Sequence, residues 1–304
     1  MLAVVNTPEA SLPVTVDEVP APSAAPNEAL VRVRASSVNR GELALLKARP
    51  RGWRPGQDVA GVVEEAAADG SGPPVGARVL GIVEGGGWAQ YVAVPTDGVA
   101  VLADTVSFEQ AATLPIAGLT ALRTLRYGAG SLASRVLVTG ASGGVGRLQV
   151  QLAAHRGAEV TAVAAREHAA DLIATGAGSV VSTVREASGL FDLITESIGG
   201  DALAAAISHV KPQGTIVVFG ASSGEKTPIS LYDFLSHENV TIHVFMSYAS
   251  PRPFAPDLQI LADLVATNRL HPHVAHTTAW TELPPALDAL RERRVHGQVV
   301  LTID

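Results

Sequence analysis

The sequence predicts an α/β protein in which a doubly wound parallel sheet is joined to a smaller β-rich domain. Three observations lead to this class. A glycine-rich turn separates an apolar run from a helical pattern at residues 135–157, apolar runs and helical patterns alternate from there to Met246, and short valine-rich runs fill residues 31–94. The first two features are typical of a nucleotide-binding parallel sheet, and the third of a compact β-barrel-like domain. With 304 residues, of which 47% are hydrophobic, the chain can bury two separate cores.

The strands expected in the first part of the chain are short and are separated by Gly and Pro. Residues 1–5 form the first expected strand. Four more are expected at residues 30–34, 59–63, 78–83 and 89–94. Runs of this length at this spacing predict the barrel-like arrangement.

The pattern becomes helical after Pro95, and strands and helices then alternate. Helices are expected at residues 108–113, 118–125 and 145–157, and parallel strands at residues 135–139, 160–165, 191–195, 215–219 and 240–245. A helix over residues 257–268 and a strand over residues 298–303 have no place in that sheet and are expected to return to the first domain. The predicted boundaries are residues 1–114, completed by 249–304, for a catalytic domain, and residues 115–248 for a dinucleotide-binding domain.

The glycine turn is the strongest functional signal. Thr139-Gly-Ala-Ser-Gly-Gly-Val-Gly146 follows a β-branched run and opens a helical pattern. Without side chains at Gly143 and Gly146, the backbone can approach a pyrophosphate, and the unpaired N–H groups of the first helical turn face the anion. The turn therefore predicts a bound dinucleotide.

The same turn occurs in short-chain dehydrogenases, where it lies near the N-terminus and accompanies a catalytic Tyr-x-x-x-Lys. Here the turn begins only at Thr139, and no tyrosine has a lysine four positions later. The tyrosines concerned are Tyr91, Tyr127, Tyr232 and Tyr248. The short-chain family is therefore excluded.

Composition excludes several other classes. The net charge of −7 provides no general basic face for nucleic acid, and no apolar run is long enough to span a bilayer. The N-terminus lacks the basic start of a secretory signal, which predicts a cytoplasmic protein. Because the chain has no cysteine, disulfides, thiolate nucleophiles and Cys-ligated zinc sites are excluded.

Along nearly its whole length the chain resembles the medium-chain dehydrogenase/reductase superfamily, and within it the zinc-free quinone oxidoreductases similar to zeta-crystallin. The segments that carry the resemblance are Ala35–Asn39, Pro55–Gly61, Gly87–Val92, Leu114–Leu122, the glycine turn and Gly297–Leu301. Several motifs in the right order are more specific than any one of them. The resemblance implies a Rossmann domain and a discontinuous, β-rich GroES-like catalytic domain, with the cofactor in the cleft between them.

The resemblance also implies chemistry without zinc. Matching the motifs places Asn39, Gln57 and Ile116 where the zinc-dependent members have Cys, His and Cys ligands to the catalytic metal. None of these three side chains is a good zinc ligand. An acceptor that does not need a Lewis acid is therefore expected.

Two candidate catalytic residues follow from the resemblance. Asn39 is the candidate amide that hydrogen-bonds the acceptor's oxygen as negative charge develops there. The alternative for Asn39 is a residue that caps a loop through its own backbone. Thr120 resembles the family's nicotinamide-contacting threonine, and a helix-interior threonine bonded to backbone is its alternative.

The choice of cofactor is argued from the end of the second parallel strand. NAD enzymes place an acidic residue there, on the ribose hydroxyls, but this chain has Ala164 and Ala165 followed by Arg166. An arginine can bind a 2′-phosphate in a charge-assisted fork, so NADPH is expected, with Glu167 beside it as the alternative contact to an NADH ribose. The residues expected to hold the cofactor are Ala141, Ser142, Gly143, Gly144, Val145, Gly146, Arg166, Gly220 and Phe245.

Trp53 and Tyr248 are the candidate substrate contacts. Trp53 lies in the basic loop 47–54, for which a solvated loop is the alternative, and Tyr248 follows the last sheet strand, where core or interface packing is the alternative. The run His271–His276 suggests a metal site, but no carboxylate completes the spacing and its proline makes the run loop-like. No metal ligand is therefore assigned.

These features predict a zinc-independent, NADPH-dependent reductase that transfers hydride to a small quinone or α,β-unsaturated carbonyl. Two alternatives remain open. One is an enoyl-thioester reductase of a biosynthetic pathway, and the other is a non-catalytic NADPH-binding sensor or structural protein. The apolar strand at residues 240–245 is expected at a sheet edge and predicts a homodimer formed by sheet-to-sheet pairing.

Overall fold

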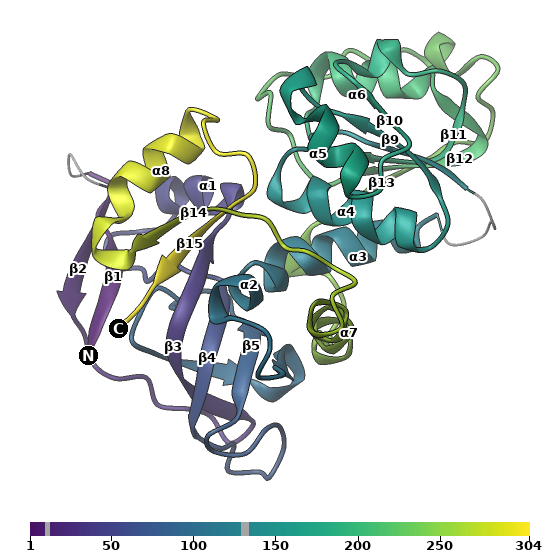
Figure 1. Ribbon diagram of the computed structural model, residues 1–304. Helices are drawn as coiled ribbons and strands as arrows, with labels where there is room; N and C mark the ends of the chain where they lie inside the picture. Colours follow the sequence, from purple (N-terminus) through teal and green to yellow (C-terminus); the bar gives the residue numbers. More distant parts are fainter. Residues whose placement is uncertain (10–12, 129–133) are drawn as a thin grey trace. The chain divides into compact units, whose positions relative to one another are not determined.

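The computed structural model describes residues 1–9, 13–128 and 134–304 (Figure 1). Internal contacts divide the chain into two compact units. The first comprises Met1–Leu119 and Pro251–Asp304, and the second comprises Thr120–Ser250. The sequence places the domain boundaries after residues 114 and 248, and these boundaries stay a prediction.

The first unit is built on a seven-stranded sheet. The order along the sheet is β14 (Val274–Ala279), β15 (Gln298–Thr302), β3 (Glu28–Val38), β4 (Asp58–Glu65), β5 (Arg78–Ile82) and β7 (Val99–Val101), and β6 (Tyr91–Pro95) pairs with β3. The final strand β15 lies antiparallel to β3, so the last strand of the chain joins the sheet formed by strands from residues 28–101. The predicted β-rich unit is thus confirmed.

Short elements complete the first unit. Strands β1 (Leu2–Asn6) and β2 (Val14–Glu18) form an antiparallel pair, and the helices are α1 (Arg40–Ala48), α2 (Phe108–Ala112), a π-helical turn (Leu114–Gly118), α7 (Ala255–Ala266) and α8 (Leu283–Arg291). The buried core includes Trp88, whose indole nitrogen donates to the carbonyl oxygen of Ser37 at 3.1 Å. A buried tryptophan whose N–H finds a partner adds packing area without an unsatisfied donor.

The second unit is a parallel sheet with helices along it. The strand order is β10 (Ser179–Val181), β9 (Glu159–Val163), β8 (Arg135–Val138), β11 (Phe191–Glu196), β12 (Val210–Val218) and β13 (Thr241–Val244), and every neighbouring pair is parallel. The helices are α3 (Leu119–Arg126), α4 (Gly144–His155), α5 (Ala169–Ala174) and α6 (Gly200–Ile207). This order reverses between β8 and β11, which is the doubly wound arrangement predicted for the chain.

Several elements were not predicted, and one expectation was wrong. The run His271–His276, expected to be a loop because it contains Pro272, enters strand β14 at Val274. Pro272 lies before the strand, so it removes no ladder hydrogen bond. Strands β2, β7 (Val99–Val101) and β10 and helices α1, α5, α6 and α8 also lacked a prediction, because each has nine residues or fewer, too few to show a clear apolar period.

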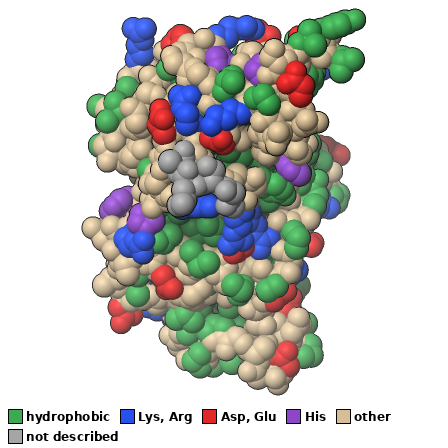
Figure 2. All heavy atoms as spheres, turned by 90° about the vertical axis from the view of Figure 1, so that its right-hand side faces the viewer, with side chains coloured by type: hydrophobic (Ala, Val, Ile, Leu, Met, Phe, Trp, Pro, Cys, Tyr) green, Lys and Arg blue, Asp and Glu red, His purple; other side chains and the backbone are tan. Residues whose placement is uncertain are grey.

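Charged side chains of both signs lie together on the surface. Figure 2 shows one face of the molecule, on which Lys and Arg side chains (blue) and Asp and Glu side chains (red) are interspersed. That face presents no extended patch of a single sign, in keeping with the absence of a strongly basic composition. Among the described residues, no helix is long and apolar enough to cross a membrane.

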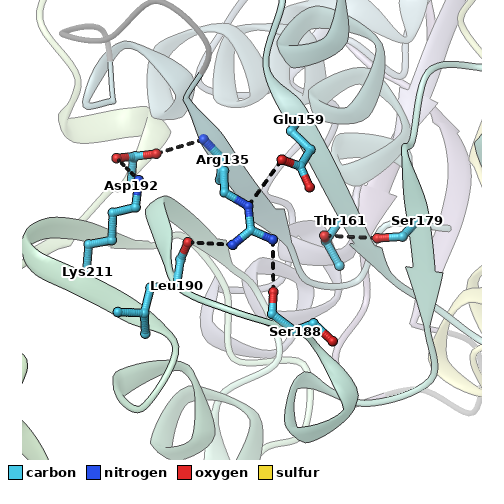
Figure 3. A network of polar contacts seen from close by, with 8 residues as sticks. All are labelled: Arg135, Glu159, Thr161, Ser179, Ser188, Leu190, Asp192 and Lys211. Atoms are coloured by element: carbon cyan, nitrogen blue, oxygen red, sulfur yellow. Dashed lines mark hydrogen bonds and ion pairs between the residues drawn. The ribbon is translucent and has the colours of Figure 1, made fainter.

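The amino-terminal edge of the parallel sheet is held by Arg135, the first residue of β8 (Figure 3). Its guanidinium donates to the carbonyl oxygens of Leu190 and Ser188, both at 2.9 Å, and to Glu159 at 3.2 Å. Its backbone N–H donates to Asp192 at 2.7 Å. One side chain therefore connects β8, β9 and the loop that leads into β11, at the edge opposite the glycine turn.

Replacing Arg135 by Met is expected to lower the free energy of unfolding by about 2 kcal/mol, because two carbonyl oxygens lose a charged donor. Urea unfolding measures the change. Arg166→Met is the matched control in the same unit, since the Arg166 side chain is exposed and makes no hydrogen bond or ion pair within the described residues. Equal urea midpoints for Arg135→Met and Arg166→Met would contradict the stabilising role of Arg135.

Candidate functional site

The glycine turn of the second unit leaves β8 and enters α4. Gly140 has φ = +59°, a conformation that glycine adopts at no steric cost. The N–H of Ala141 donates to the carbonyl oxygen of Val163 at the end of β9 (3.1 Å), and the N–H of Gly143 donates to that of Gly140 (3.0 Å). The turn is therefore fixed against the neighbouring strand at the point where the sheet order reverses.

Gly146 must lack a side chain. A Cβ atom built on Gly146 would lie 2.4 Å from the carbonyl oxygen of Gly140 and 2.7 Å from the Cα of Ala141, both backbone atoms that cannot move aside. This close approach brings the first turn of α4 against the end of β8. The N–H groups at the start of a helix have no partner inside it and carry partial positive charge, so this arrangement suits a pyrophosphate.

A cavity of about 310 Å³ lies at the carboxyl ends of the neighbouring strands. Val163, Val184, Ile198 and Ala205 give it apolar walls, and Thr183 and Arg185 add polar groups. None of these six residues was expected at a site from the sequence. Because β10 was not recognised, the segment after it could not be assigned to the carboxyl edge of the sheet, where ligands of such folds bind.

Glu196 connects the glycine turn to the wall of this cavity. The carboxylate is fully buried at the end of β11 and accepts the N–H of Ile198 at 2.8 Å, the N–H of Gly199 at 3.0 Å and the hydroxyl of Thr139 at 3.2 Å. Burial raises its pKa, and these hydrogen bonds oppose the rise. A buried acid in this position fixes the segment after β11 relative to the segment after β8.

The other residues expected at the cofactor have distinct environments. Ser142, Gly144 and Val145 are half-buried, and Arg166 is exposed just beyond Ala164, which is buried at the end of β9. Gly220 lies close to Ser197, since a Cβ there would be 2.9 Å from the carbonyl oxygen of that residue. Phe245 is buried directly after β13.

In the first unit, Asn39 belongs to a buried polar cluster. Its Nδ2 donates to Asp58 Oδ2 at 2.5 Å and lies 3.4 Å from the hydroxyl oxygen of Ser37, which itself donates to the same carboxylate oxygen. The N–H of Ile116 donates to Asp58 Oδ1 at 2.7 Å. Because Ser37 Oγ and Asp58 Oδ2 are themselves hydrogen-bonded, both lie on the same side of Nδ2, and one Nδ2 hydrogen makes both contacts. The other Nδ2 hydrogen has no acceptor among the described residues.

A second buried carboxylate, Glu42, lies next to this cluster. It accepts the N–H of Asn39 at 2.8 Å and the N–H of Gln57 at 3.0 Å. Burial raises its pKa well above the ordinary value, and the charge of Asp58 raises it further. Burial also raises the pKa of Asp58, to about 6, although its hydrogen bonds to Ser37 and Asn39 oppose the rise.

Asn39, Gln57 and Ile116 do not form a zinc site. All three bond through N–H groups to the two buried carboxylates, and Ile116 has no side-chain ligand atom. Zinc in proteins takes thiolate, imidazole or carboxylate ligands, so this set of side chains does not fit the metal. The cluster instead holds the amide of Asn39 in one place.

Thr120, Trp53 and Tyr248 differ in exposure. Thr120 is buried, and its carbonyl oxygen accepts the hydroxyl of Thr124 at 2.6 Å. Trp53 is half-buried against the core of the first unit, with the Arg49 guanidinium 5.8 Å from its ring centroid. Tyr248 is 80% exposed, so it is not a core residue. Their contacts to cofactor or substrate remain predictions.

We expect the stability of the protein relative to its Asp58→Asn variant to decline as pH rises from about 4 to about 6.5, by up to about 3 kcal/mol. The folded state raises the pKa of Asp58 from 3.8 to about 6, so it binds the proton more tightly than the unfolded chain does. This contribution is complete below the unfolded pKa and disappears as pH passes the folded one. Urea unfolding at several pH values measures it.

Asp69→Asn is the control for this pH series. Hydrogen bonds from Ser71 lower the pKa of the exposed Asp69 carboxyl, so its replacement changes the pH dependence in the opposite direction. Parallel stability curves for the protein and Asp58→Asn would contradict the raised pKa.

Two family models match the chain. One, described as alcohol dehydrogenase GroES-like domain, matches residues 25–104, and the other, described as zinc-binding dehydrogenase, matches residues 144–263. Among relatives, quinone oxidoreductase of Mus musculus is 29% identical over 260 residues, which are 78% of this chain and 76% of that protein. The NorB protein of the spectinabilin polyketide synthase system of Streptomyces orinoci is 33% identical over 311 residues, 95% of this chain but only 14% of that much longer protein.

Solved structures have the same fold. The quinone oxidoreductase from Coxiella burnetii has a TM-score of 0.85 and 25% identity, with 100% of this chain and 99% of that chain covered. A mycobacterial protein complexed with NADPH has a TM-score of 0.88 and 24% identity over the full length of both chains. The resemblance predicted from the motifs is confirmed, and the chain belongs to the medium-chain dehydrogenase/reductase superfamily of oxidoreductases, with quinone oxidoreductases among its relatives.

Proposed function

We propose that the protein is a zinc-independent, NADPH-dependent reductase of small quinones or α,β-unsaturated carbonyls. The observation that carries the proposal is the glycine turn, where Gly146 lies against Gly140. The cavity at the carboxyl edge of the sheet is lined by Val163, whose carbonyl oxygen accepts the N–H of Ala141 in the turn. Bound NADPH would supply the hydride. The N–H groups at the start of α4 would hold its pyrophosphate, and the apolar walls of the cavity would pack against the flat faces of the adenine ring.

Arg166 supports the choice of NADPH over NADH. Its guanidinium is exposed and has no ion-pair partner within the described residues, so it is available to a 2′-phosphate. Ala164 stands where an acidic residue would bind the ribose of NAD. The mycobacterial structural relative, complexed with NADPH, is in keeping with this choice.

Asn39 is the proposed contact to the oxygen of the acceptor. Asp58 and Ser37 share one Nδ2 hydrogen, which fixes the plane of the amide, and the second hydrogen, without an acceptor among the described residues, is available to the acceptor's oxygen. An oxygen that gains negative charge is such an acceptor. Quinones and enones spread this charge over a carbonyl, so the reaction needs no metal to polarise it.

Stopped-flow absorbance of the nicotinamide tests the proposal. The protein and NADPH are mixed with benzoquinone, naphthoquinone, an alkenal and an enoyl thioester, with NADH as the control cofactor. We expect rapid oxidation of NADPH by a quinone or the alkenal. Asn39→Ala should lower kcat by about 100-fold, the effect of removing one oxyanion donor, with NADPH affinity unchanged. Ser37→Ala, which keeps the amide, should lower kcat by less than about tenfold.

Bound NADPH without oxidation by any acceptor would contradict the reductase and favour a sensor or structural role. An NADPH-binding protein that turns over only the enoyl thioester would favour the second candidate below.

An enoyl-thioester reductase is the second candidate. The similarity to NorB, a polyketide synthase system protein, over 95% of this chain favours it. Arginines of the loop 47–54 could bind the anionic carrier of a thioester. Arg51 is exposed there, and the Arg49 guanidinium stacks near Trp53. Loss of thioester turnover in Arg49→Ala or Arg51→Ala, with quinone turnover kept, would support this activity.

We also propose that the protein is a homodimer joined through β13. This strand is the edge of the parallel sheet, and Ile242 and Val244 on it are 38% and 66% exposed. Nearby in the sequence, Leu231 and Leu235 are 82% and 68% exposed. An apolar edge strand with unpaired backbone groups favours pairing with a second copy.

Light scattering is expected to give the mass of a dimer for the protein and of a monomer for Val244→Lys, because a buried lysine at the new strand pair is costly. Val75→Lys is the control, since Val75 is 63% exposed in the other unit and its replacement should leave the dimer intact. A monomeric wild-type protein at micromolar concentration would rule out the proposal.

A further inference from the structure

Arg147 is a buried charge next to the glycine turn that the proposed function does not use. It is the fourth residue of α4, and its side chain is only 6% exposed. A guanidinium keeps its charge at any pH at which a protein is folded, so burying it is costly unless it is paired and hydrogen-bonded. Its contacts therefore indicate what it does.

The Arg147 guanidinium binds the backbone of the glycine turn. Its Nε donates to the carbonyl oxygen of Ser142 at 3.0 Å. The next backbone group, the N–H of Gly143, donates to the carbonyl oxygen of Gly140 at 3.0 Å. Both ends of the Ser142–Gly143 peptide are thus bound by the protein itself. This peptide immediately precedes α4, so its orientation sets the direction in which the first N–H groups of the helix point.

The same guanidinium connects the turn to another element. Its Nη1 forms an ion pair with Asp171 of α5, whose carboxylate is half-exposed. Helix α5 follows the segment 164–168 that contains Arg166. Arg147 therefore links the turn that faces the pyrophosphate to the segment that would meet the ribose of the cofactor.

We propose that Arg147 is a positioning residue for the dinucleotide, which fixes the phosphate turn and contributes equally to the affinity for NADPH and for NADH. The inference rests on the proposed cofactor binding. Arg147 reaches a backbone carbonyl and Asp171 but contacts no part of the cofactor that differs between the two dinucleotides. Arg166 is different, because a contact to the 2′-phosphate stabilises NADPH alone.

Dissociation constants for NADPH and NADH, measured by fluorescence titration of the full chain, test the inference. Arg147→Met keeps the length of the side chain and removes both polar contacts, so both constants should rise by about tenfold or more and by the same factor. Arg147→Lys retains the charge and one contact and should recover part of the affinity. Arg166→Met, the matched control, should raise the constant for NADPH alone.

Asp171→Asn keeps the bond from Arg147 to Ser142 and weakens the ion pair. It should raise both constants equally, by less than Arg147→Met does. In cofactor-free Arg147→Met, hydrogen exchange should be faster for the amides of residues 140–146 than in the wild type. A general loss of stability would instead accelerate exchange throughout the unit. If Arg147→Met does not fold, Arg147→Lys and Asp171→Asn test the inference.

Two results would overturn the inference. In the first, Arg147→Met folds and binds both dinucleotides as tightly as the wild type does. If Arg147→Met does not fold, the same result for both Arg147→Lys and Asp171→Asn would overturn the inference. Alternatively, the loss could be confined to NADPH, which would make Arg147 a direct phosphate contact. Failure of the proposed cofactor binding is a separate outcome, because the unaltered protein would then bind neither dinucleotide.

Discussion

The contact between the carbonyl oxygen of Gly140 and the backbone of Gly146 is the constraint on which the dinucleotide-binding unit depends. At 2.4 Å from that oxygen there is no room for a Cβ atom, so α4 can begin this close to β8 only with glycine at position 146. The same oxygen accepts the N–H of Gly143. The start of the helix, the direction of its free N–H groups and the place of the turn beside β9 all follow from one close backbone approach.

Two buried charged side chains, Arg147 and Glu196, bind the residues of this turn and its neighbours. Arg147 binds the carbonyl oxygen of Ser142, and Glu196 accepts the hydroxyl of Thr139 and two backbone N–H groups after β11. Each charge is buried where hydrogen bonds offset part of the cost of losing water. Glycines make the turn possible, but they do not make it rigid, because glycine loses more conformational freedom on folding than any other residue. The charged partners restrict that freedom.

The sequence predicted the doubly wound parallel sheet and the glycine turn because both depend on local patterns. A β-branched run, a turn and a helical period lie within a single stretch of chain, and alternation along the chain leaves few topologies. The partners of Arg147, Glu196 and Asp58 could not be predicted, because they come from residues distant in sequence: 24 residues separate Arg147 from Asp171, and 57 separate Thr139 from Glu196. Strand β10 was missed because its three residues are too few to show a period. Asn39 was found through a motif, yet its bond to Asp58 was not.

The cluster around Asn39 connects the three positions that match the zinc ligands of other superfamily members through hydrogen bonds. The three positions matched to zinc ligands are held here through N–H groups that converge on two carboxylates, Asp58 and Glu42. Hydrogen bonds to these acids can fix loops as metal–ligand bonds do, but they provide no Lewis acid. The group that this cluster would offer to an acceptor is the neutral amide of Asn39, whose orientation is set by Asp58. Such a group would stabilise charge that the acceptor can delocalise by itself, which is why we propose conjugated carbonyls and quinones, rather than simple alcohols, as substrates.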